Sequence, residues 1–94
     1  MIQDYLAGEI SICLGRLQRA ATRDPGGQVA RLRREVEDGP LAGLTTVVTH
    51  ALAMADSLCW ESLSRGDVVA FTCQARAAAD LRQLSVCAHL IPDA

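Results

Sequence analysis

The side chains best suited to catalysis or metal binding in this chain are two histidines, His50 and His89, and four cysteines. The cysteines are Cys13, Cys59, Cys73 and Cys87. No Cys-x-x-Cys pair is present, and two residues such as Cys87 and His89 point about 200° apart on a helix, so they would not hold one ion. The sequence therefore predicts no metal site and no cofactor. We expect the cysteines to pack as small apolar residues, and a redox or soft-metal role for them stays open.

His50 lies in the middle of a helical pattern, within Thr-His-Ala-Leu-Ala-Met-Ala at residues 49–55. This segment resembles the histidine phosphotransfer domains, and the resemblance implies an exposed histidine on a bundle helix that accepts a phosphoryl group. Those domains follow His-x-Leu with Lys-Gly, whereas Ala53 and Met54 stand here, so the cation that stabilises the phosphoryl charge is missing. Phosphotransfer through His50 therefore ranks behind other functions, and we predict that the protein is not an enzyme.

The number and position of charged residues limit which partners the protein could bind and where in the cell it could be located. The net charge is −2 and all nine basic residues are arginine, which argues against a nucleic-acid partner. Asp4 and Glu9 occupy the amino-terminal segment, where a secretory signal would carry basic residues, so we expect a cytoplasmic protein. A membrane span over residues 41–60 would place His50 and Asp56 in hydrocarbon, and we predict no contact with a membrane.

Six of the nine arginines lie in the first 34 residues, a possible basic strip for an acidic partner. Acidic residues follow directly at Glu35, Glu37 and Asp38, and no aromatic residue is interleaved. We interpret these arginines as a solvated helix surface. Later in the chain, Arg76 and Asp80 stand one turn apart and are expected on another outer surface.

Apolar residues recur at steps of three and four along the chain, which predicts four helices at about 2–22, 28–38, 40–64 and 68–90. Pro40 fits the first turn of the third helix, with Asp38 or Gly39 as its cap. Gly66 is expected to end that helix and Asp67 to cap the next. The expected fold is all-α: a single domain, 1–94, formed by a small antiparallel bundle of three long helices and one short helix.

The third helix is almost uncharged, because only Asp56 and Glu61 carry charge between residues 40 and 64. Its main apolar face is expected to hold Leu41, Leu44, Val48, Ala51, Leu52, Ala55, Cys59, Ser62 and Leu63. The opposite face holds Thr46, His50, Ala53, Ser57, Trp60 and Ser64, with Met54 on one flank. Such a helix is packed on both sides within one chain, or it forms a seam between two copies with Trp60 as the anchor; we favour self-association.

These observations predict a non-catalytic regulatory or adaptor module that acts through protein–protein association. The expected partners are a second copy, bound through the third and fourth helices, and an unknown protein. The candidate binding residues are Trp60, His50, Ala53, Met54 and Ser57. The alternative is a binder or carrier of an apolar small molecule, which would require an enclosed apolar cavity at Trp60 or Met54.

Overall fold

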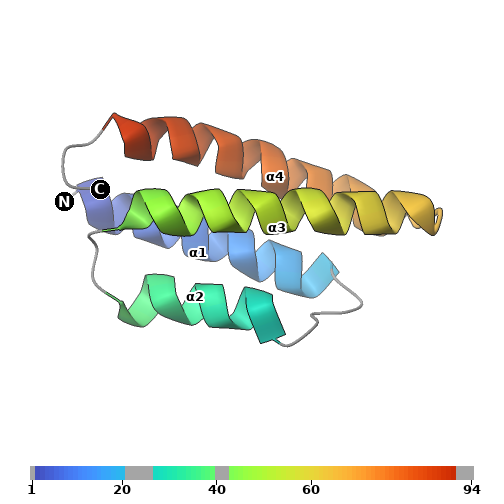
Figure 1. The fold of residues 1–94 in the computed structure, drawn as a ribbon, viewed down its shortest axis with the longest axis horizontal. Helices are drawn as coiled ribbons and strands as arrows, with labels where there is room; N and C mark the ends of the chain where they lie inside the picture. The colour runs from blue at the N-terminus through green and yellow to red at the C-terminus, as the bar shows by residue number, and fades with distance from the viewer. Residues whose placement is uncertain (1, 21–26, 40–42, 91–94) are drawn as a thin grey trace.

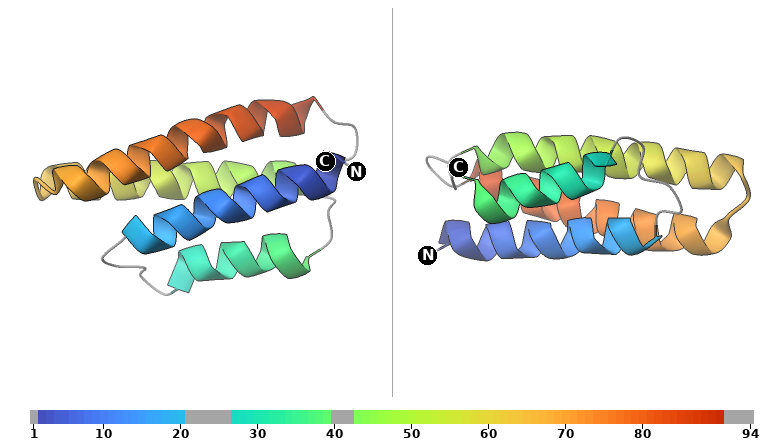
Figure 2. Two further views of the ribbon diagram at one scale, coloured as in Figure 1. Left: turned by 180° about the vertical axis from the view of Figure 1, so that it is seen from behind. Right: turned by 90° about the horizontal axis from the view of Figure 1, so that it is seen from below.

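A computed structural model describes residues 2–20, 27–39 and 43–90 of the chain. It contains the helices α1 (Ile2–Ala20), α2 (Gln28–Asp38), α3 (Leu44–Ser64) and α4 (Val68–His89). The prediction of an all-α fold is confirmed, and the four helices pack against one another (Figure 1). Seen from behind, α1 lies between α2 and α4 (Figure 2).

The core follows from the periodicity of the apolar residues. On α1, Ile10, Leu14 and Leu17 are fully buried, and on α2 the buried residues Val29, Leu32 and Val36 form one stripe. Because these residues recur every three or four positions, each helix turns a single apolar face toward the centre. The long helices therefore share one core, and α2 covers part of it.

The start of α3 differs from the sequence prediction. The helix begins at Leu44, after Gly43, whose backbone is in the left-handed conformation with φ of 92°. A right-handed helix cannot continue through such a residue, so a helix starting at Pro40 with Asp38 or Gly39 as its cap is wrong. Gly39 instead ends α2, and its amide donates to the Glu35 carbonyl at 2.9 Å. Pro40 and Leu41 lie outside the described residues.

The connection between α3 and α4 is as predicted. Gly66 has φ of 71°, and the Asp67 amide donates to the Ser62 carbonyl at 2.9 Å, which closes α3. The Asp67 carboxylate then accepts a hydrogen bond of 3.1 Å from the Ala70 amide and caps α4. The two helices form a hairpin that extends past the ends of α1 and α2 (Figure 1).

Burial along α3 is one-sided. The buried residues are Leu44, Val48, Ala51, Ala55, Leu58 and Ser62. The opposite residues Thr46, His50, Ala53, Ser57, Trp60 and Ser64 are all exposed. The interpretation of α3 as a helix packed on both sides within one chain is therefore wrong. The physical reason is that α2 is short, lies beside only the amino-terminal part of α3 and does not close over this face (Figure 1).

Candidate functional site

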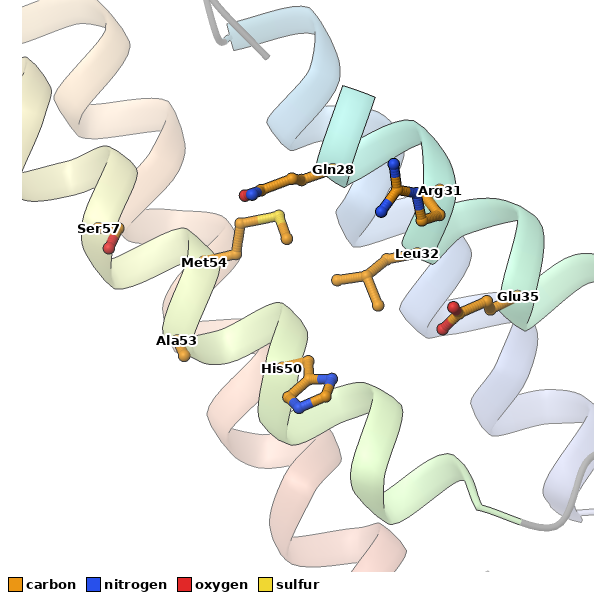
Figure 3. Close-up of a pocket in the computed structure, with 8 residues that line it drawn as sticks. All are labelled: Gln28, Arg31, Leu32, Glu35, His50, Ala53, Met54 and Ser57. Carbon is orange, nitrogen blue, oxygen red and sulfur yellow. The ribbon is translucent and has the colours of Figure 1, made fainter. Parts of the chain in front are cut away.

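Four of the five candidate binding residues line one groove between α2 and α3, with a volume of about 440 Å³. From α3 they are His50, Ala53, Met54 and Ser57; from α2 the groove is lined by Gln28, Arg31, Leu32 and Glu35 (Figure 3). The α3 residues meet here because steps of three and four place them on one side of the helix. Sequence reasoning missed the α2 wall, since nothing in the sequence says which side of α3 the short helix covers.

The groove is open to solvent and is lined by both polar and apolar side chains. The side chains of Leu32 and Met54 point toward one another across it, and Leu32 is buried (Figure 3). Of the eight lining residues, only Leu32 and Met54 are not exposed. The enclosed apolar cavity that a carrier of apolar molecules would need is therefore not present at Met54.

Arg31 changes the surroundings of His50. The phosphotransfer resemblance lacks a cation on α3 itself, but α2 brings the Arg31 guanidinium to the groove that His50 lines (Figure 3). His50 is exposed, as that resemblance requires. A cation from a neighbouring helix could stabilise an anion there in place of one on the same helix.

Trp60 lies outside this groove, one turn further along α3. Its side chain is 70% exposed, and Leu63, Val68 and Val69 beside the hairpin connection are 52%, 69% and 77% exposed. We call these four residues the tip patch. Leu63 was expected on the buried face, but it is exposed because neither α1 nor α2 reaches this end of the hairpin (Figure 1). All four lie on the last turns of α3 or the first turn of α4, and exposed apolar side chains at such a position are candidates for contact with a partner.

Charged groups flank the tip patch. Glu61 pairs with Arg65 at 3.2 Å along α3, and Asp56 of α3 pairs with Arg82 of α4 at 3.1 Å. All four side chains are partly exposed, so each pair adds little to stability.

The cysteines occupy three different environments, and none forms a disulfide. Cys13 is buried, and burial, followed by the nearby Asp80, raises the pKa of its thiol. Burial and then Asp56 also raise the pKa of the half-buried Cys59. Cys73 and Cys87 are exposed on α4, so the interpretation as core residues is correct for Cys13 and wrong for these two. Within the described residues, no group of three His, Cys, Asp or Glu side chains could hold a metal ion.

The chain matches no known protein family, no curated protein and no solved structure. None of the described helices has the length and apolar character needed to cross a membrane.

Proposed function

We propose that this protein is a non-catalytic regulatory or adaptor module that works through protein–protein association. In this proposal it is an antiparallel four-helix bundle that forms a homodimer through α3 and α4. The observation that carries the proposal is the tip patch, where Trp60 and three aliphatic side chains stand exposed at one end of the hairpin.

Of the described helices, only α3 and α4 pack together at the hairpin end, and two helices alone do not bury their apolar surface as a larger bundle does. Past the ends of α1 and α2, no other described helix backs α3 and α4, and a two-helix unit leaves apolar surface in water (Figure 1). A second copy that placed its own hairpin here would supply the missing layers and form a four-helix unit. Tryptophan is the residue type that most often dominates such contacts, because its burial removes a large apolar area from water.

The flanking charges suit the same arrangement. Stable interfaces have an apolar centre and a polar border, and in this proposal the pair of Glu61 with Arg65 contributes to that border. Ala53 and Ser57 extend the contact from Trp60 toward the groove, where small residues allow close approach of a partner helix.

The test is the mass in solution of Trp60→Ala against a matched control. Tyr5→Ala is the control, because Tyr5 is an aromatic residue of similar exposure, 66%, on α1. We expect light scattering to give a dimer for the wild type and for Tyr5→Ala, and a dimer dissociation constant at least about tenfold higher for Trp60→Ala. A monomeric wild type would exclude the dimer, and equal dimer masses for all three proteins would exclude Trp60 from its interface.

A second candidate function is binding of a small molecule in the groove between α2 and α3. Leu32 and Met54 facing each other favour it, since they offer an apolar contact surrounded by polar groups (Figure 3). The fluorescence of anilinonaphthalene sulfonate tests this function. The probe should bind the wild type and lose affinity with Met54→Gln but not with Ile12→Gln, an exposed apolar position on α1.

Histidine phosphotransfer is the third candidate, favoured by the placement of Arg31 in the groove of His50. Acetyl phosphate should then leave an acid-labile phosphoryl group on the wild type and on His89→Ala, but none on His50→Ala. Labelling that is the same in all three proteins would exclude His50.

A further inference from the structure

A second cavity, on the far side of the molecule from the α2 groove, lies between α1 and α4. Its volume is about 630 Å³, and Arg16 and Arg19 of α1 line it together with Cys73, Arg76 and Asp80 of α4. The Arg16 guanidinium donates to the Asp80 carboxylate at 3.0 Å, which joins the two helices at this point. Three of the nine arginines of the chain therefore meet at one cavity, although 57 residues separate Arg19 from Arg76.

The cavity carries an excess of positive charge. Three arginines and one aspartate line it, which leaves two positive charges, in a chain whose net charge is −2. Asp80 is engaged by Arg16, and the described residues provide no ion pair for Arg19 or Arg76. Like charges repel one another unless an anion lies between them, and guanidinium groups match the oxygen geometry of phosphate and carboxylate.

A third cavity adjoins this one, and the ion pair of Arg16 and Asp80 lines both. Its volume is about 710 Å³, and it is lined by Tyr5, Leu6, Glu9, Cys13, Arg16, Asp80, Gln83, Leu84, Val86 and Cys87. Of its lining residues, Leu6 and Cys13 are buried, while Tyr5 and Val86 are exposed. We call it the apolar groove. Its Glu9 carboxylate disfavours an anion there, so an anionic group belongs at the arginine end.

We propose that the cavity of Arg16, Arg19 and Arg76 binds the phosphate dianion of a phosphate monoester, whose apolar substituent lies along the apolar groove. Arg19 and Arg76 donate to the phosphate oxygens, and Asp80 holds Arg16 in place beside them. A single group with two negative charges balances the two excess positive charges, which a monocarboxylate does not. None of the residues that line this site belongs to the tip patch, and the proposal does not rest on the proposed association.

Nuclear magnetic resonance titration with inorganic phosphate and with hexyl phosphate tests the site. We expect both probes to shift the guanidinium signals of Arg19 and Arg76. Arg76→Gln should weaken binding of both probes about tenfold or more, because it removes a charged hydrogen bond to an oxyanion. Arg34→Gln is the matched control: it removes the same charge from an exposed position of α2 that lines none of these cavities, and it should bind as the wild type does.

Each outcome decides the proposal. Equal weakening by Arg76→Gln and Arg34→Gln would show attraction to overall charge only and would overturn it, as would the absence of any shift. If Arg76→Gln loses its helical circular dichroism, Arg19→Gln replaces it with the same expectation. For the apolar groove, hexyl phosphate should bind at least about threefold more tightly than inorganic phosphate, and Val86→Ser should reduce only that difference. Equal affinity of the two probes would overturn the placement of the substituent.

Discussion

The Ser62 hydroxyl donates a hydrogen bond of 2.6 Å to the Gln74 side-chain oxygen, and both side chains are buried between α3 and α4. This pair lies beyond Leu58, the last buried apolar residue of α3. The inside of the hairpin end is therefore joined by a polar contact where the rest of the bundle has aliphatic packing.

Ser62→Ala removes the donor and leaves the buried Gln74 oxygen without its partner. The expected loss of unfolding free energy is about 1–3 kcal/mol, the cost of an unsatisfied buried polar group. Urea denaturation followed by circular dichroism measures it. Because replacing both partners by apolar groups removes the unsatisfied atom, the double variant Ser62→Ala with Gln74→Leu should be more stable than Ser62→Ala alone. A double variant that is less stable than the single one would show that the hydrogen bond is not the relevant contact.

The free energy of unfolding should decrease at acid pH because the Glu37 carboxylate becomes protonated. The pKa of its carboxyl lies below the usual 4.5, because the Ser11 hydroxyl donates to it at 2.8 Å and Arg33 at 3.0 Å. As the pH falls below about 4.5, Glu37 becomes protonated in the unfolded chain before it does so in the folded protein. The stabilisation that Glu37 provides is therefore present at higher pH and is lost as the pH falls through the pKa of the folded state. We expect Ser11→Ala to destabilise at pH 7 and to differ less from the wild type in acid. Denaturation midpoints at both pH values test this, with the exposed Ser57→Ala as a control that should show no such dependence.

Replacing two of the glycines by alanine should change the stability of the protein in opposite directions. Gly43 has φ of 92°, so Gly43→Ala places a side chain in left-handed backbone and should destabilise by about 1–2 kcal/mol. Gly8 lies within α1 with no other atom within 4 Å of an added Cβ, so Gly8→Ala should stabilise by about 0.5–1 kcal/mol. Melting temperatures measure both changes. Destabilisation by Gly8→Ala would contradict the description of α1.

Much of the fold was predictable from local sequence signals. The bounds of α2, the end of α3 at Ser64 and the start of α4 at Val68 follow from apolar periodicity and from Gly66 and Asp67, because these signals act within a single turn. The start of α3 was missed because Pro40 is a strong helix-start signal in its own right. Gly43, three residues later, gave no clear signal, because glycine occurs both within helices and at the position before their first residue.

Contacts between distant segments were harder to predict. Sequence reasoning placed Asp80 beside Arg76 on an outer surface, yet the carboxylate pairs with Arg16 of α1. It also treated Arg16 and Arg19 as part of an amino-terminal strip and did not connect them with Arg76. Such groupings depend on which helices become neighbours, and spacing along one helix does not contain that information. For the same reason, the periodicity identified the uncovered face of α3 but not how little of it α2 would cover.

The extension of the hairpin past its neighbouring helices also affects how the protein fluctuates (Figure 1). When the last turns of α3 and the first turns of α4 separate, little buried apolar area is exposed, so this end can open locally while the remaining helices stay folded. Backbone amides near Ser62 and Ala70 would then exchange hydrogen with water sooner than those near Leu14 or Leu81. A molecule that bound α3 and α4 together would slow the exchange of these amides. Its binding would then be detected as slower hydrogen exchange at amides that it does not contact directly.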